Sequence, residues 1–186
     1  ANHVSNLDTP IILTALPTVV RRRTVVAAAM DNFFMRPSTA ARTILMFNAI
    51  PIDRHRVNRR SSDLALEVLR EGWNLLIFPE GGRSPTGNLQ EFKGGAAFLA
   101  ERVGAPVVPV YVAGAGELRG PKYAKAPRFT DVPWQNRRKV SVTFGAPLVT
   151  GADETVRRFN ARIEDAVVAL GRQATGDDTL DVERRD

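Results

Sequence analysis

Short apolar runs alternate with helical segments along the chain. Three of these runs, at 24–30 (TVVAAAM), 73–79 (WNLLIFP) and 106–112 (PVVPVYV), are typical of buried strands. Between the first two lies the amphipathic segment DLALEVLREG, a helical pattern that stops at Gly72. Strands that alternate with helices are typical of an α/β protein. The sequence therefore predicts a single, mostly parallel or mixed sheet that is covered by helices on both faces.

The remaining segments complete one domain. Further helices are expected at 9–17, 38–47, 96–104 and 153–171, and short strands at 49–53 and 139–145. We expect this domain to occupy residues 1–172, which is long enough to bury a sizeable core. The polar residues 173–186 are expected to form a flexible tail.

Composition narrows the classes of function. The chain has no cysteine, which excludes disulfides and cysteine-based zinc sites. No run approaches the length of about 18 apolar residues that a membrane-spanning helix needs. Lys and Arg number 26 against 20 Asp and Glu, so the net charge is +6. This excess suits anionic lipid headgroups, nucleic acid or phosphorylated small molecules.

The basic residues gather in three runs, at 21–23, 54–60 and 136–139. Each run by itself is typical of a solvated surface. Proteins that bind single-stranded nucleic acid usually combine such runs with stacking aromatic side chains. No aromatic residue falls within 54–60. We therefore expect no nucleic acid among the partners.

His3 and Asp8 stand together in NHVSNLD at the start of the chain, and His3 is one of only two histidines. Ser5 with Asp8 three residues later is typical of a capping box before an apolar helix, which would make Asp8 structural. Alternatively, Asp8 in the first helical turn binds His3 in the preceding loop and fixes the tautomer of a catalytic base. The two interpretations are compatible.

A Gly-rich loop, EGGRSPTGNLQEFKGG, follows the run at 73–79. Its glycines allow backbone to approach a ligand closely, and Arg83 beside them can hold a phosphate through two hydrogen bonds. Burying Glu80 at the end of an apolar strand needs a partner, and we expect Arg83 to be that partner. The loop lacks the Gly-Lys-Ser/Thr of a Walker loop, and the chain has no Gly-x-Ser-x-Gly elbow. Taken alone, the loop also fits a simple surface turn.

Four blocks in order are more specific than any one of them. NHVSNLD, AIPIDR, FPEGGRS and APVVPV follow one another between residues 2 and 110, and the FK pair at 92–93 adds to them. This series resembles the glycerolipid acyltransferases, in particular the 1-acyl-glycerol-3-phosphate acyltransferase family. The resemblance covers about the first three-fifths of the chain.

The resemblance implies roles for individual residues. His3 and Asp8 fall on the catalytic pair of the family. Gly82 stands where the family usually has Thr, and Gly94 stands where a second basic residue often follows Lys93. These two departures bear on the identity of the acceptor more than on the chemistry. The substrate-binding positions of the family fall on Arg54, Glu80, Gly81, Gly82, Arg83 and Lys93.

The implied reaction moves a fatty acyl group from acyl-CoA or acyl carrier protein to the free hydroxyl of lysophosphatidate or a related lysophospholipid. It needs no metal and no cofactor. Without a cysteine or a serine elbow, the simplest mechanism is direct attack with His3 as general base. We expect a protein on the cytoplasmic side of an anionic membrane, bound through 21–23 or 56–60, or tethered by a segment upstream of Ala1.

Two rival classes remain open. A basic nucleic-acid-binding α/β domain would share the charge but has no use for a His–Asp pair beside an Arg–Gly loop. A metal-dependent phosphohydrolase, which would require a divalent cation, would use Asp8, Asp31, Asp53 and Glu80.

His55 is a second candidate base, although its position in a basic run favours a surface role.

Overall fold

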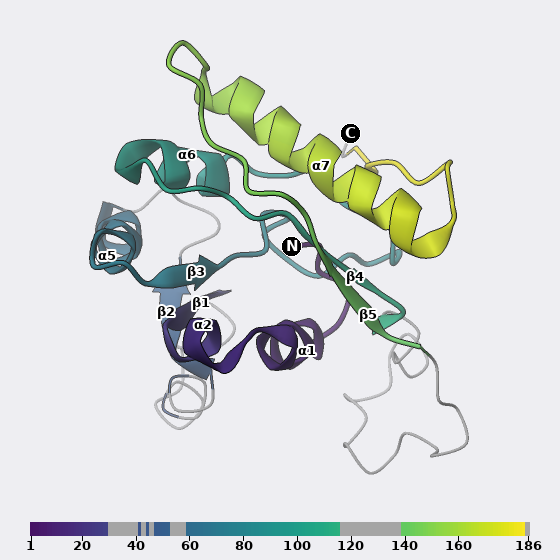
Figure 1. The fold of residues 1–186 in the computed structure, drawn as a ribbon, viewed down its shortest axis with the longest axis horizontal. Coiled ribbons are helices and arrows are strands. Elements are labelled where there is room, and N and C mark those ends of the chain that lie inside the picture. The colour runs from purple at the N-terminus through teal and green to yellow at the C-terminus, as the bar shows by residue number, and fades with distance from the viewer. Residues whose placement is uncertain (30–40, 42–43, 45–46, 53–58, 116–138, 185–186) are drawn as a thin grey trace.

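The computed structural model describes residues 1–29, 41, 44, 47–52, 59–115 and 139–184 (Figure 1). Most of the helix expected at 38–47 lies outside these residues, as do Asp31, Asp53, Arg54 and His55. The described elements, in chain order, are α1 (Asp8–Ala15), α2 (Thr18–Arg22), β1 (Thr24–Ala29), β2 (Ala49–Ile52), α5 (Arg59–Arg70), β3 (Asn74–Leu76), α6 (Gly95–Val103), β4 (Val110–Ala113), β5 (Ser141–Phe144) and α7 (Val156–Thr175).

The strands form a parallel sheet and an antiparallel pair. Strand β1 lies in the middle of the parallel sheet, in the order β2-β1-β3, and β4 pairs antiparallel with β5. The α/β class is therefore confirmed, but hydrogen bonding divides the expected single sheet into two. The strand expected at 106–112 starts only at Val110, because Pro106 and Pro109 have no N–H to donate to a ladder.

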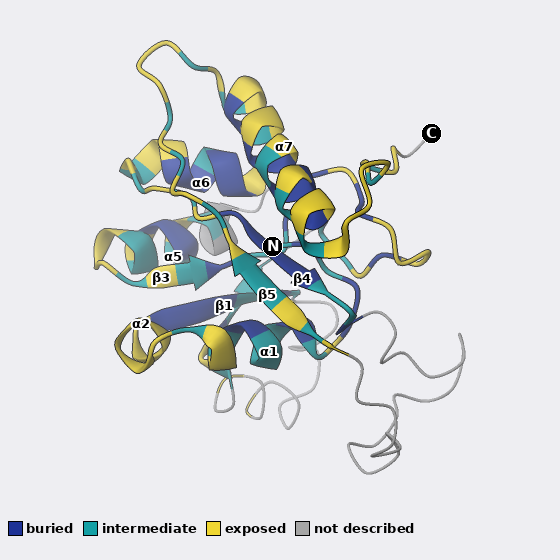
Figure 2. Cartoon of the chain, turned by 45° about the vertical axis from the view of Figure 1, so that its right-hand side comes forward, coloured by how far each residue is buried: buried dark blue, intermediate teal, exposed yellow. Residues whose placement is uncertain are grey.

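Helices cover the strands from two sides. Both views place α1 and α2 on one side and α6 and α7 on the other (Figures 1 and 2). Helix α5 contacts β2 and β3, and α7 contacts β4. None of the described helices is long and apolar enough to cross a bilayer. Apolar burial joins the elements in three clusters, represented by Ile12, Val26 and Val112, by Tyr111, Phe159 and Val167, and by Ala65, Leu66 and Leu99.

The C-terminal segment lies against the domain. Helix α7 continues to Thr175, beyond the start of the flexible tail expected at 173–186. Leu180 and Val182 then pack against the cluster that α7 shares with Tyr111. A side chain in place of Gly171 would collide with Leu180, so this glycine permits the close passage of the segment over α7.

Candidate active site

His3 and Asp8 are in direct contact. His3 Nδ1 donates to Asp8 Oδ2 at 2.8 Å, and the same oxygen accepts the backbone amides of Val4 and Ser5, each at 2.7 Å. Asp8 is fully buried, whereas 18% of the His3 side chain is exposed. A neutral imidazole that donates from Nδ1 carries its lone pair on Nε2. The pair therefore presents a base whose tautomer is set by a buried carboxylate.

Asp8 also orders the turn before α1. Its side chain accepts the backbone amide of Ser5, as the last residue of a capping box accepts the amide of the first. The reciprocal bond differs, because Ser5 Oγ accepts from the amide of Leu7, at 3.2 Å. The N-cap of α1 is Leu7, and no side chain among the described residues caps the helix, so only the bond from Ser5 to Asp8 remains of the predicted capping box. One carboxylate serves both this turn and the histidine.

Two further contacts fix the loop that carries His3. The imidazole stacks on Phe78, with ring centroids 4.1 Å apart and an interplanar angle of 23°. The buried side chain of Asn2 donates to the carbonyl of Val112 at 3.1 Å and accepts its amide at 2.7 Å. Asn2 thus joins the loop to β4. The sequence did not predict this role, since no local pattern pairs a loop amide with a strand 110 residues away.

Glu80 holds the backbone of His3. Its Oε1 accepts the amide of His3 at 2.6 Å, and its Oε2 accepts the amide of Gln90 at 3.1 Å. The amide of Ser84 donates to the carbonyl of His3 at 2.9 Å. Both backbone groups of His3 are therefore bonded to the segment 80–84.

The expected pairing of Glu80 with Arg83 is wrong. Glu80 is fully buried, whereas the side chain of Arg83 is exposed. Two backbone amides satisfy the carboxylate without taking a guanidinium out of water. Arg83 is consequently not committed to Glu80 and remains available to an anionic ligand.

Glu80 titrates near neutral pH. Burial raises the pKa of its carboxyl from 4.5 to about 7, although the hydrogen bonds from the amides of His3 and Gln90 act in the opposite direction. A charge change on Glu80 therefore occurs at a carboxyl that directly holds the backbone of His3.

Gly81 of this turn and Lys93 at the end of the following loop lie against each other. Gly81 has a φ of 71°, and a Cβ built there would lie 2.7 Å from Lys93 Nζ. The amide of Lys93 donates to the carbonyl of Pro79 at 2.8 Å. A glycine is therefore needed both for the backbone conformation and for the close approach of the lysine.

Most of the predicted site residues thus converge. His3, Asp8, Glu80, Gly81 and Lys93 are linked by the contacts above, and Gly82 and Arg83 continue the same turn. The predicted phosphate-binding residue Arg54 lies outside the described residues.

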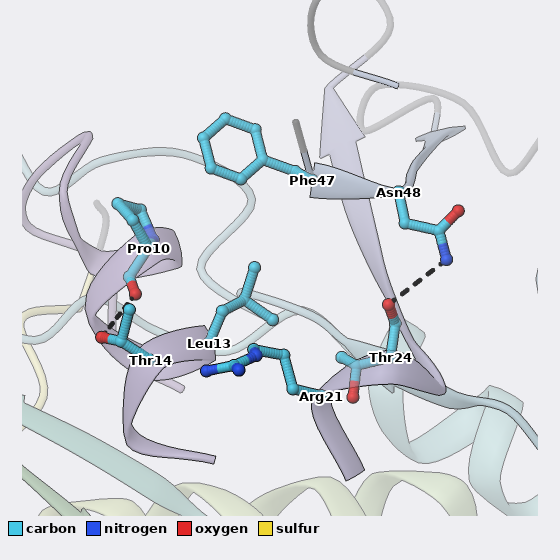
Figure 3. A pocket seen from close by; sticks show the side chains of 7 residues that line it. All are labelled: Pro10, Leu13, Thr14, Arg21, Thr24, Phe47 and Asn48. Carbon is cyan, nitrogen blue, oxygen red and sulfur yellow. Dashed lines mark hydrogen bonds between the residues drawn. The ribbon is translucent and has the colours of Figure 1, made fainter. Parts of the chain in front are cut away.

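A pocket of about 260 Å³ lies elsewhere (Figure 3). Its lining contains neither His3, Asp8 nor any residue of the segment 80–93. Among the described residues that line it, Arg21 carries the one charged side chain; these residues are Pro10, Leu13, Thr14, Arg21, Thr24, Phe47 and Asn48.

Comparison with known proteins identifies the family. The family model described as Acyltransferase matches residues 1–113. The chain belongs to the acyltransferase family. The probable 1-acyl-sn-glycerol-3-phosphate acyltransferase of Mycoplasma pneumoniae is 27% identical over 153 residues, which is 80% of this chain and 55% of that protein. Human 1-acyl-sn-glycerol-3-phosphate acyltransferase beta is 32% identical over 113 residues, 59% of this chain and 38% of that protein.

The fold also has a solved counterpart. The crystal structure of the 1-acyl-sn-glycerophosphate (LPA) acyltransferase PlsC from Thermotoga maritima matches with a TM-score of 0.67 at 23% identity, covering 94% of this chain and 64% of that chain. This likeness confirms the α/β fold of the acyltransferase. The alignments to the two curated relatives above span 38% and 55% of those proteins.

Proposed function

We propose that this acyltransferase moves a fatty acyl group from a thioester of coenzyme A or acyl carrier protein to the free hydroxyl of lysophosphatidate or a related lysophospholipid. The observation that carries the proposal is the His3–Asp8 contact, in which a buried carboxylate binds Nδ1 of a partly exposed imidazole. Family membership supports acyl transfer, and the names of the relatives support a lysophosphatidate-like acceptor.

The reaction proceeds by direct attack. His3 Nε2 takes the proton of the acceptor hydroxyl while the hydroxyl oxygen bonds to the thioester carbonyl carbon. The carbonyl oxygen thereby becomes an oxyanion. When the tetrahedral intermediate collapses, the C–S bond breaks and the imidazolium returns the proton to the departing thiolate. Asp8 stabilises the imidazolium between these steps. A positioned general base contributes roughly 10²–10⁴-fold to the rate.

The turn at 80–83 binds the acceptor in this proposal. Arg83 projects an exposed guanidinium from that turn and suits two-point binding of a phosphate. Lys93, over Gly81, contributes a second positive charge to the phosphate or to the oxyanion. Arg54 completes the phosphate clamp, an assignment that rests on the sequence resemblance.

A lipid acceptor requires contact with a membrane, and one face of the domain suits this. Val19 and Val20 of α2 are 79% and 37% exposed. Arginines 21–23 follow the two valines directly, and Arg21 also lines the pocket in Figure 3. Apolar side chains beside cations suit an anionic bilayer surface. We propose that this face binds the cytoplasmic side of a membrane.

A free-thiol release assay tests the proposed function. Acyl-CoA and acyl carrier protein thioesters of several chain lengths are each offered with lysophosphatidate, other lysophospholipids or no acceptor. Thiol release that requires a lysophospholipid and is unaffected by EDTA supports the proposal. Salt-sensitive DNA binding without turnover would favour the nucleic-acid hypothesis. Metal-dependent phosphate release would favour the phosphohydrolase.

A further inference from the structure

The C-terminal segment binds the loop that follows the active-site turn. Glu183 Oε2 accepts hydrogen bonds from Thr86 Oγ1 at 2.6 Å and from Gln90 Nε2 at 2.8 Å. The amide of Glu183 donates to the carbonyl of Leu89 at 2.7 Å, and Gln90 and Glu183 form a parallel β-bridge. Side chain and backbone of Glu183 therefore hold the same short stretch of loop.

That stretch of loop is bonded to the residue that holds the backbone of the His3–Asp8 pair. Gln90 is buried, and its backbone amide donates to Glu80 Oε2 at 3.1 Å. The other oxygen of Glu80 accepts the amide of His3 at 2.6 Å. Glu183 is thus connected to the backbone of His3 through two residues, and the side chain of Glu183 touches neither His3 nor Glu80.

A second anchor lies next to the first. Arg184 pairs with Glu164 of α7 at 3.1 Å, and the other oxygen of Glu164 accepts the amide of Phe92 at 2.7 Å. Asn160 Nδ2 donates to the carbonyl of Phe92 at 3.0 Å. Helix α7 therefore fixes the residue before Lys93, so the loop is held at both 90 and 92 from the C-terminal side.

From this arrangement we infer that Glu183 is a positioning residue for the His3–Asp8 pair. Glu183 holds the side chain of Gln90 and so keeps the backbone amide of Gln90 on Glu80. Glu80 in turn keeps the backbone of His3 in place. The segment lies beyond residues 1–113, which the family model matches. The catalytic consequence rests on the proposed function, whereas the mechanical link can be measured without turnover.

The variant Glu183→Ala tests the link because it removes the oxygen that accepts the hydrogen bonds of Thr86 and Gln90, which the carbonyl oxygen of a glutamine could still accept. We expect kcat to fall about tenfold, because misplaced catalytic groups lose rate without losing ground-state binding, and KM for the thioester to stay within about twofold. The matched control is Glu154→Ala. Glu154 is likewise a carboxylate with one oxygen that accepts two hydrogen bonds, from the backbone amide of Gly151 at 3.0 Å and from Arg162 at 2.6 Å. It has no bond to the loop and should behave as wild type.

A double-mutant cycle and hydrogen exchange complete the test. In a Gln90→Ala background, Glu183→Ala should change kcat by less than about twofold, because the side-chain bond between residues 90 and 183 is already gone. In Glu183→Ala, the amides in peptides 1–8 and 86–92 should exchange faster than in wild type or Glu154→Ala, with unchanged circular dichroism. Unchanged exchange in peptide 1–8 would overturn the inference even if the enzyme shows no turnover. If wild type shows no turnover but Glu183→Ala shows this faster exchange, only the proposed function is overturned.

Discussion

The Glu80 carboxylate joins two parts of the chain that are 77 residues apart, because it accepts the amide of His3 at 2.6 Å. The next segment adds a second bond, from the amide of Gln90 at 3.1 Å. The position of His3 is consequently set by its backbone as well as by the contact between its ring and Asp8. Changes in Glu80 should therefore affect both stability and activity.

The first prediction concerns pH and Glu80. The pKa of Glu80 is about 7 in the folded state, against an ordinary value of 4.5. Between these two pH values the folded state therefore binds more protons than the unfolded state. The free energy of unfolding should fall as pH rises from 4.5 to 7, by an amount on the order of 3 kcal/mol from this group. Glu80→Gln should lack this part of the decline.

Urea unfolding at several pH values checks this prediction. The difference in unfolding free energy between wild type and Glu80→Gln should be largest in favour of wild type near pH 4.5 and should shrink toward pH 7. Parallel curves for the two proteins would show that Glu80 does not titrate in this window.

Asp8→Asn should reduce kcat severely, by about 10³–10⁴-fold, because an amide does not enforce the same tautomer of His3. It should also lower stability by about 1–3 kcal/mol, since Oδ2 of Asp8 accepts three hydrogen bonds in a buried place. Steady-state kinetics and urea unfolding measure the two effects separately. Normal activity with only the stability loss would leave Asp8 a purely structural role.

Arg83→Lys should raise KM for the lysophospholipid and leave KM for the thioester nearly unchanged. A lysine lacks the planar fork that binds a phosphate at two points, and Arg83 is exposed on the turn beside Gly81 and Gly82. Arg54→Lys should show the same pattern. If instead the thioester KM rises and the acceptor KM does not move, these arginines bind the phosphates of the acyl carrier.

Membrane binding should depend on the α2 face. Replacing the three arginines at 21–23 by Gln should weaken binding to anionic vesicles by about 1 kcal/mol for each arginine near the surface. Val19→Glu should weaken binding to the same vesicles, because 79% of this valine is exposed. Sedimentation with vesicles of increasing anionic content, at two salt concentrations, measures the effect. Binding that ignores lipid charge and salt would exclude this surface.

The local parts of the fold were predictable from sequence. Helix α6 ends at Val103 and is capped by Gly104, which has a φ of 66°, as the Gly signal predicts. The His3–Asp8 contact was also within reach, because a loop and the first helical turn bring residues five positions apart together. Such features depend on short stretches whose conformational preferences are strong.

The long-range polar contacts were not predictable. Neither the bond between Asn2 and Val112 nor that between Glu80 and Gln90 follows from spacing, since a backbone amide of any residue can serve as donor. The docked C-terminal segment was missed because its composition is polar. The available signal was the pair Leu180 and Val182, alternate residues that pack on one side.

If His3 is the general base, its removal should abolish acyl transfer, and the other histidine provides the control. The measurement is lysophospholipid-dependent thiol release by His3→Ala beside His55→Ala, both checked for folding by circular dichroism. We predict that His3→Ala loses about 10²–10⁴-fold in kcat, while His55→Ala retains wild-type activity. More than a few per cent of wild-type kcat in folded His3→Ala, or a comparable loss in His55→Ala, would contradict the claim.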